Sequence, residues 1–116
     1  MASLSQLVDN VVVTTFELDQ PEIHVGRRGD NDIRIDEISV SGHQALIEAV
    51  PNAYLEGTVD YDIPDQNSTN GTFVNELRID RRQRLNSNDL VRIGWNEFRF
   101  IDEDENALEK TAYILD

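Results

Sequence analysis

The chain has 116 residues, a length that suits one domain with a self-sufficient hydrophobic core. It has no cysteine and only two histidines, which excludes a disulfide scaffold, a thiolate metal site and a His-rich metal site. A net charge of −13 argues against nucleic acid and anionic membranes as partners. The sequence shows no signal peptide and no apolar run of about 18 residues, so we expect a cytoplasmic protein with no membrane span.

Short segments rich in β-branched residues alternate with turn residues along most of the chain. The sequence predicts strands over residues 11–18, 22–25, 33–35, 44–50, 72–74, 77–79, 84–85, 90–93 and 98–101, and a hairpin about Gly57 made of residues 54–56 and 58–63. Residues 1–9 carry little signal. Strands spaced by about ten residues indicate an all-β sandwich. We expect a single domain over residues 1–116, with its core at about 11–101 and an acidic tail over 102–116 that has a weak helical tendency at 107–110.

The basic residues are few and clustered. Nine of the ten are arginines, and seven of these nine gather in two groups, one at Arg27, Arg28 and Arg34 and one over residues 78–84. Arginine is the side chain suited to forked recognition of carboxylate or phosphate. Exposed charges more than about 8 Å apart are largely screened at physiological salt, so an acidic body is compatible with a small basic pocket.

The segment over residues 65–75, which is polar or glycine except for Phe73 and Val74, gives the main indication of a binding loop. Asn70-Gly71 is a strong signal for a tight turn, and Thr72-Phe73-Val74 begins a strand directly after it. The preceding Ser68, Thr69 and Asn70 either satisfy local backbone groups or present hydrogen-bonding groups to a polar ligand. Gly26-Arg27 and Val40-Ser41 also fall in loops between strands. An arginine fork, hydroxyl donors and an amide are groups suited to holding a phosphate monoester.

With these segments in this order, the chain resembles the forkhead-associated (FHA) domain family of phosphothreonine-peptide-binding modules, from about Ile23 to Ile101. The motifs that carry the resemblance are Gly26-Arg27, Asp32-Ile33 with Ile35, Val40-Ser41, Ala45-Leu46-Ile47, Asp65, Ser68 to Thr72, Val74-Asn75, and Asp89 with Ile93-Gly94. The resemblance implies an eleven-stranded β-sandwich of two twisted, mostly antiparallel sheets, with a peptide bound across loops at one end. It also implies a monomeric signalling module that binds a phosphothreonine-containing protein, uses no cofactor and is not an enzyme.

The resemblance assigns a role to each matching residue. Arg27 is expected to contact the phosphate, Ser41 to donate its hydroxyl to it, and Thr69 to lie beside the phosphothreonine. Asn70 is expected to bond the peptide backbone, with Ser68 next to it in the binding loop. The residues Gly26, Gly71 and Thr72 are expected to shape the loops.

The chain departs from the family pattern beside Ser41. The family often has Arg or Asn at the next position, a further ligand contact, where this chain has Gly42. The family's structural histidine is replaced by Gln44, with His43 one place earlier, and Glu76 replaces a turn glycine. Loss of a contact to a charged group costs about 1–3 kcal/mol, so we expect weaker binding or the use of Arg28 instead. Gln44 keeps a donor and an acceptor, so the loop scaffold is expected to survive.

Other classes of function fit the sequence less well. Ser41 and His43 have no nucleophile elbow, and Asp30 and Asp32 lack the glycine and closing glutamate of a calcium loop. We therefore expect neither catalysis nor a bound metal. The alternative that remains is a phosphate-independent interaction or oligomerisation module, which the loss of a side chain at Gly42 favours.

Overall fold

In a computed structural model of the chain, residues 2–54, 57–64 and 68–103 are described, and they form eleven strands. The strands are β1 (Ala2–Val8), β2 (Val11–Glu17), β3 (Glu22–Gly26), β4 (Ile33–Arg34), β5 (Ala45–Pro51), β6 (Val59–Pro64), β7 (Thr72–Val74), β8 (Leu77–Arg78), β9 (Arg82–Leu85), β10 (Leu90–Ile93) and β11 (Asn96–Asp102).

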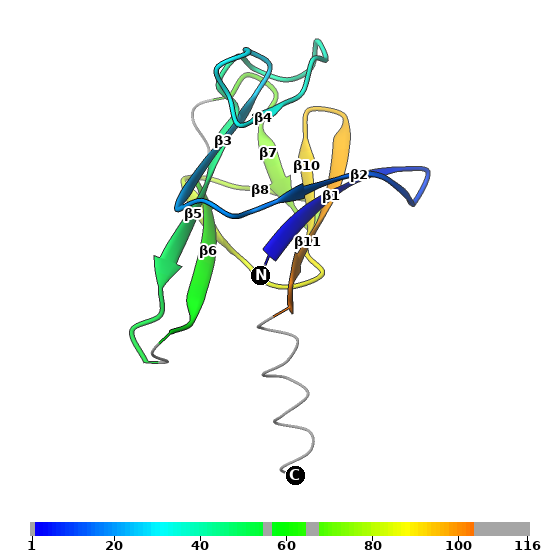
Figure 1. The fold of residues 1–116 in the computed structure, drawn as a ribbon. Helices are drawn as coiled ribbons and strands as arrows, with labels where there is room; N and C mark the ends of the chain where they lie inside the picture. Colours follow the sequence, from blue (N-terminus) through cyan, green and yellow to red (C-terminus); the bar gives the residue numbers. More distant parts are fainter. Residues whose placement is uncertain (1, 55–56, 65–67, 104–116) are drawn as a thin grey trace.

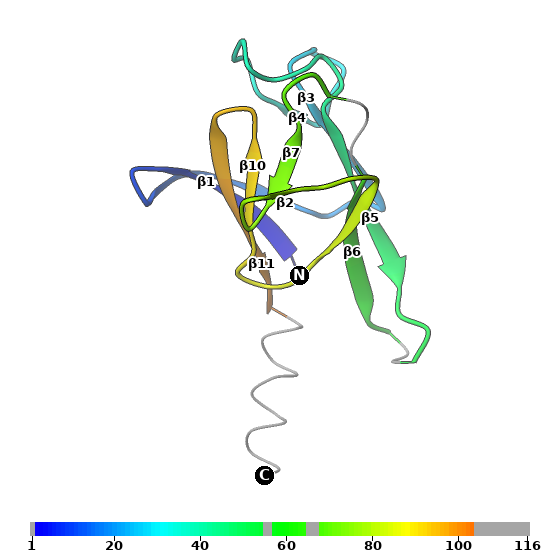
Figure 2. The ribbon, with the colours of Figure 1, turned by 180° about the vertical axis from the view of Figure 1, so that it is seen from behind.

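The strands form two sheets. A six-stranded sheet has the order β2-β1-β11-β10-β7-β8, and a five-stranded sheet has the order β4-β3-β5-β6-β9. Neighbouring strands pair in the antiparallel sense, except that β3 and β4 are parallel. The predicted sandwich of two mostly antiparallel sheets is confirmed, and Figures 1 and 2 show its two layers from opposite sides.

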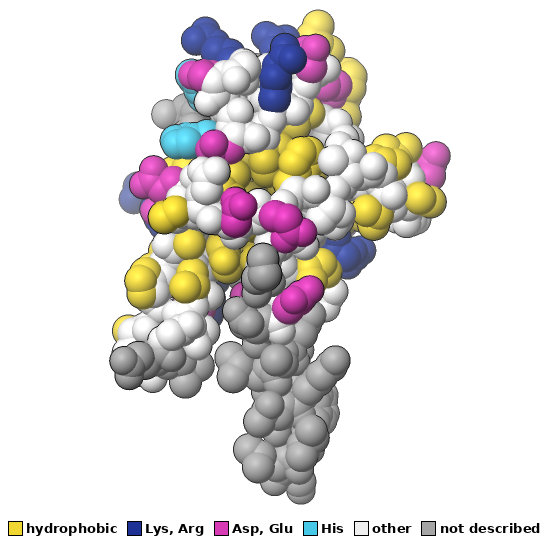
Figure 3. Space-filling model, viewed as in Figure 1, with side chains coloured by type: hydrophobic (Ala, Val, Ile, Leu, Met, Phe, Trp, Pro, Cys, Tyr) yellow, Lys and Arg dark blue, Asp and Glu magenta, His cyan; other side chains and the backbone are white. Residues whose placement is uncertain are grey.

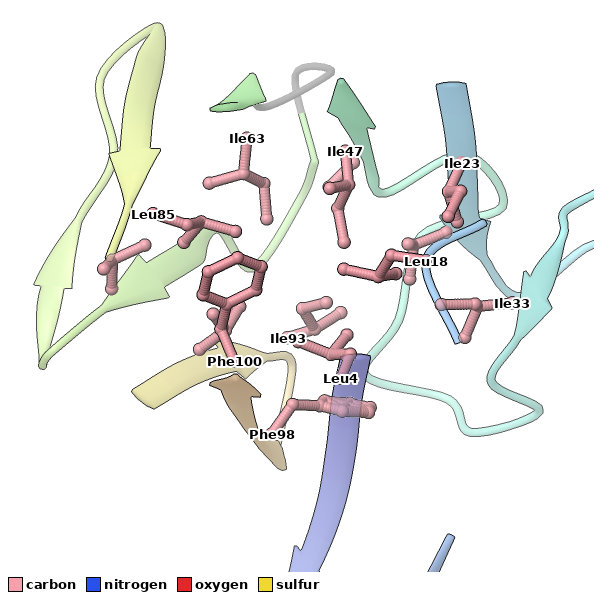
Figure 4. Close-up of a cluster of buried hydrophobic side chains, with 14 of the residues drawn as sticks. Leu4, Leu18, Ile23, Ile33, Ile47, Ile63, Leu85, Ile93, Phe98 and Phe100 are labelled. Carbon is pink, nitrogen blue, oxygen red and sulfur yellow. The ribbon is translucent and has the colours of Figure 1, made fainter. Parts of the chain in front are cut away.

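The core lies between the sheets and follows the alternation of each strand. Val91 and Ile93 on β10 and Phe98 and Phe100 on β11 are fully buried, while the residues between them face outward. Figure 4 shows side chains from both sheets meeting in this layer. Burying one such side chain contributes about 1.5–3 kcal/mol, so the core rather than the loops holds the fold together.

The first strand was missed by the sequence analysis. β1 inserts between β2 and β11, with Leu4 opposite Phe100 in the register and fully buried. Its serines and glutamine have low strand propensity, and its place in the sheet depends on pairing with a strand near the far end of the described chain. The alternation of Ala2 and Leu4 with serine was the available signal.

The predicted hairpin about Gly57 is confirmed in its second strand, since residues 58–63 correspond to β6 (Val59–Pro64), but its first strand over residues 54–56 is not the partner of β6. β6 pairs instead with β5, with Val50 opposite Asp60, and Tyr54 lies in the connection between these strands. Residues 55–56 of the predicted hairpin lie outside the described residues, as do residues 104–116 of the acidic tail with the helical tendency at 107–110. In the described part of the chain, no helix is long and apolar enough to cross a membrane.

Several connections gather at one end of the sandwich. The loops that follow β3 and β4, the segment that leads into β7, and the turn between β10 and β11 lie at the upper end in both Figure 1 and Figure 2. The predicted binding residues fall in these loops, so the fold brings segments far apart in the sequence to one surface.

Candidate functional site

The loop after β3 is fastened to the loop that contains Ser41 through backbone groups. The Arg27 N–H donates to the Ser41 carbonyl oxygen at 2.9 Å, and the Arg28 N–H donates to the Gly42 carbonyl oxygen at 3.2 Å. A Cβ on Gly26 would stand 2.3 Å from that Gly42 oxygen, so only glycine permits this approach. The side chain of Arg27 is exposed.

A third loop joins the first two at Ser41. The Thr69 N–H donates to the Ser41 hydroxyl oxygen at 3.0 Å. The Asn70 side-chain amide donates to the Ser39 carbonyl oxygen at 2.8 Å. Arg27, Ser41, Thr69 and Asn70, which the sequence placed in separate loops, therefore lie together at one end of the sandwich.

The buried side chain of Gln44 links these loops through hydrogen bonds. Its side chain is 0% exposed, and its Oε1 accepts from the Ser41 N–H at 2.9 Å. Its Nε2 donates to the Gly71 carbonyl oxygen and to the Thr72 hydroxyl, each at 2.9 Å. The one amide thus links the Ser41 loop to the turn at Gly71, using both the donor and the acceptor that the sequence analysis considered important.

The missing side chain at Gly42 leaves space that Arg28 occupies. A Cβ on Gly42 would lie 2.9 Å from Arg28 Nε and 3.2 Å from its Cδ and Cγ. The stem of Arg28 therefore crosses the position where the family often carries an Arg or Asn side chain. Within the described residues, neither Arg27 nor Arg28 forms a side-chain hydrogen bond or a close ion pair.

Ser68 and His43 differ from the other predicted site residues. Ser68 is only 6% exposed, which leaves its side chain little surface to offer a ligand, whereas Thr69 and Asn70 are exposed. His43 is exposed, and its Nε2 lies 3.1 Å from Asp30 Oδ2. That hydrogen bond is the main cause of a lowered pKa at the Asp30 carboxyl.

Sequence reasoning missed residues that position these loops. The Glu37 carboxylate accepts from both the backbone N–H and the hydroxyl of Ser39, and the hydroxyl bond is the main reason that the pKa of Glu37 is lowered. The Ser39 hydroxyl oxygen in turn accepts from the Trp95 N–H at 3.0 Å. The Asn31 amide donates to the carbonyl oxygens of Arg28 at 2.9 Å and Gly42 at 2.8 Å. The signal was the tendency of short polar side chains to bond nearby backbone groups.

The loop end of the molecule carries exposed charges of both signs. Figure 3 shows basic side chains at the loop end with acidic side chains among them, and charges of both signs on the body below. The described residues contain no group of three or more His, Cys, Asp or Glu side chains that could hold a metal ion. The site therefore offers arginines, hydroxyls and amides to an anionic ligand.

Comparison with known proteins identifies the fold family. The family model for the FHA domain matches residues 23–94. The chain is 38% identical over 107 residues to the ABC transporter ATP-binding/permease protein Rv1747 of Mycobacterium tuberculosis, covering 88% of this chain and 11% of that protein. It is 37% identical over 86 residues to the glycogen accumulation regulator GarA of Mycolicibacterium smegmatis, covering 74% of this chain and 48% of that protein. The chain thus spans less than half the length of these relatives.

Solved structures agree with the family match. Mycobacterium tuberculosis EmbR, solved with a low-affinity phosphopeptide, superposes with a TM-score of 0.72 at 34% identity over 86% of this chain and 24% of that one. The FhaA FHA domain, solved with the intracellular domain of Rv3910, gives a TM-score of 0.70 at 26% identity, covering 86% of this chain and 99% of that one. The sequence match over residues 23–94 and the shared sandwich together show that this chain belongs to the FHA domain family.

Proposed function

We propose that the chain is a phosphothreonine-dependent interaction module that binds an extended segment of a phosphorylated partner through the loops at one end of the sandwich. In this function it is not an enzyme, it acts as a monomer, and it uses neither cofactor nor metal. Its partner is a protein or peptide that carries phosphothreonine, in the cytoplasm, rather than nucleic acid or membrane.

Each exposed residue of the site has a chemical role in the proposal. Arg27 supplies a charge-assisted fork to the phosphate, and the Ser41 hydroxyl donates to one of the remaining phosphate oxygens. Thr69 lies against the phosphothreonine, and Asn70 bonds the peptide backbone. Asn70 Nδ2 is engaged with Ser39, so its Oδ1 is the atom suited to accept a peptide N–H. Ser68, which is buried, supports the loop.

The observation that carries the proposal is the meeting of three loops at Ser41. The Ser41 carbonyl oxygen accepts from the Arg27 N–H at 2.9 Å, and its hydroxyl oxygen accepts from the Thr69 N–H at 3.0 Å. An arginine and two hydroxyl groups are thereby gathered on a preformed surface, which lowers the ordering cost of binding.

Arg28 compensates for Gly42 in the proposal. Its stem lies across Gly42, with Nε 2.9 Å from the position of a Cβ there, and its guanidinium has no close ion pair among the described residues. The residue that follows Arg27 in the sequence therefore offers a second exposed guanidinium in a chain of net charge −13. The solved complex of EmbR with a phosphopeptide shows that a member of the family binds this class of ligand.

The direct test is titration of the purified chain with a degenerate phosphothreonine peptide library and with its unphosphorylated counterpart. We expect retention of the phosphorylated library only. Arg27→Ala should abolish detectable binding while leaving the melting temperature nearly unchanged, because an exposed arginine contributes little to stability. The matched control is Arg99→Ala, which removes one charge from β11. Unfolding of Arg27→Ala, or unchanged binding by it, would refute the assignment.

Two further measurements examine the ligand. A phosphoserine peptide should bind more weakly than its phosphothreonine counterpart, because it lacks the methyl group that Thr69 helps to enclose, and equal affinities would remove Thr69 from that role. Binding should weaken as the pH falls below about 6, because the phosphate loses its second negative charge there. Affinity that stays constant from about pH 7 to pH 5 would contradict recognition of the dianion.

A second candidate function is phosphate-independent self-association, and one observation favours it. Val11, Val12 and Val13 lie on β2 at the edge of the six-stranded sheet and are 62%, 54% and 54% exposed. An edge strand that carries no charge before its last residue, Glu17, is a template for antiparallel pairing with a second copy of the chain. Sedimentation at increasing concentration tests this candidate, and Val12→Lys should abolish any dimer. A monomer at all concentrations would eliminate the candidate.

A further inference from the structure

Arg78 lies directly over the turn of the candidate binding loop. It is the last residue of β8, exposed, and paired in register with Phe73 on β7. Gly71 has φ +85°, and a Cβ built on it would lie 2.7 Å from Arg78 Nε and 3.1 Å from its Cζ. The guanidinium of Arg78 therefore occupies the space that a side chain at position 71 would fill, next to the turn that follows Asn70.

The aromatic ring beside Arg78 is shared with a second arginine. Phe73 Cε1 lies 3.2 Å from the same Cβ position on Gly71, so the ring and the Arg78 guanidinium border one small space. On the other neighbouring strand, Arg92 Cζ lies 4.1 Å from the centroid of the Phe73 ring. Arg92 is thus engaged in a cation–π contact with this ring.

Arg78, in contrast, has no anionic partner among residues 2–54, 57–64 and 68–103. Within the described residues it forms no hydrogen bond and no ion pair, whereas Arg82 bonds Glu48 and Asp62, and Arg84 bonds Asp60. The chain has 23 acidic residues for its ten basic ones, so intramolecular partners for an arginine are plentiful. A guanidinium that the described part of this acidic chain leaves unpaired, fixed beside a loop that presents candidate ligand-binding groups, is available to an anion from the ligand.

We propose that Arg78 forms a second anion-binding subsite, separate from the phosphothreonine contacts, and that the chain prefers ligands with a second anionic group near the phosphothreonine. The anionic group is a carboxylate or a second phosphate. This inference rests on the proposed phosphothreonine binding. Gly71 is two residues from Thr69, a span of at most about 7 Å, and an extended peptide rises about 3.3 Å per residue. The second group therefore lies within about three residues of the phosphothreonine.

The test uses the full chain and a set of synthetic peptides. The reference peptide has phosphothreonine flanked by alanines, and the others carry one aspartate or one phosphoserine at a single position within three residues on either side. Affinities are measured by fluorescence anisotropy for wild type, Arg78→Gln and Arg78→Lys. Arg99→Gln is the control, because it removes a charge from β11 of the same sheet.

We expect wild type to bind the best aspartate peptide about two- to fivefold more tightly than the reference, as befits an exposed ion pair, and the phosphoserine peptide more tightly still. Arg78→Gln should lose both preferences and keep its affinity for the reference peptide. Arg78→Lys should keep a reduced preference, because the charge remains without the fork. Arg99→Gln should behave as wild type.

The outcomes separate this inference from the proposal on which it rests. Binding of the reference peptide without any preference for a second anion, or a preference that survives in Arg78→Gln, overturns the Arg78 subsite alone. Binding of no phosphothreonine peptide by folded wild type overturns both. A preference for aspartate without one for phosphoserine supports the subsite and identifies a carboxylate as its ligand, and the reverse result identifies a phosphate.

Discussion

Replacing Gln44 by leucine tests whether one buried amide holds the loops of the site together. The two side chains have similar volume, so the substitution removes hydrogen bonds with little change in packing. The Ser41 N–H loses its bond to Oε1, and the Gly71 carbonyl oxygen and the Thr72 hydroxyl each lose a bond from Nε2. Gln44 is 0% exposed, so water does not replace these bonds without a rearrangement of the loops.

The magnitude follows from these two backbone groups. A buried polar group that loses its partner costs about 1–3 kcal/mol. The greater hydrophobicity of leucine offsets this loss by about 1 kcal/mol. Two such groups together cost about 2–6 kcal/mol, so after this offset we expect Gln44→Leu to lower the free energy of unfolding by about 1–5 kcal/mol. For a domain of this size, about 4 °C of melting temperature corresponds to 1 kcal/mol, so the melting temperature should fall by about 4–20 °C.

The assay is thermal and urea denaturation followed by far-ultraviolet circular dichroism. Gln83→Leu is the matched control, because Gln83 is exposed and its amide, among the described residues, bonds only the adjacent Arg84 carbonyl oxygen at 3.2 Å. Its stability should change by less than about 0.5 kcal/mol. If Gln44→Leu melts within 2–3 °C (about 0.5 kcal/mol) of wild type, the amide does not stabilise the loops and the reasoning fails.

Three other substitutions probe the backbone and the titrating groups of the fold. Glu76 has φ +71°, so Glu76→Gly should raise the stability in urea by about 0.5–1 kcal/mol through relief of left-handed strain, and a loss of stability would contradict this. Gly26→Ala should lower the free energy of unfolding by more than about 2 kcal/mol, because its Cβ would stand 2.3 Å from a backbone oxygen. Gly29→Ala is the control and should melt as wild type does, because no heavy atom lies within 4 Å of a Cβ at that position. The pKa of Glu37 is lowered from its ordinary value of 4.5 by its bond to the Ser39 hydroxyl. Ionised Glu37 therefore stabilises the fold above pH 4.5, and this contribution is lost as the pH falls through the lowered pKa of Glu37 in the folded protein. The difference in melting temperature between wild type and Glu37→Gln should therefore shrink on acidification below pH 4.5, and a constant difference would refute the link.

Local features of the sequence determined the class of fold and the turns and loops in which the candidate site residues lie. Asn70-Gly71 predicted a turn, and the structure places Gly71 at φ +85° before β7. The alternation over residues 90–93 and 98–101 predicted strands whose inward residues are buried. These features depend on the backbone preferences of turn residues and on the alternation of apolar and polar residues along a strand. Both can be recognised from residues that are neighbours in the sequence.

Only the tertiary structure decided which groups meet. The burial of Gln44 beneath Gly71 and Ser41, the crossing of Gly42 by Arg28, and the approach of Arg78 to Gly71 each depend on strand order. β1 likewise became a strand by pairing with β11 rather than through its own propensity. Contacts between segments far apart in the chain cannot be predicted from the local pattern of apolar residues, because they arise from the packing of whole sheets.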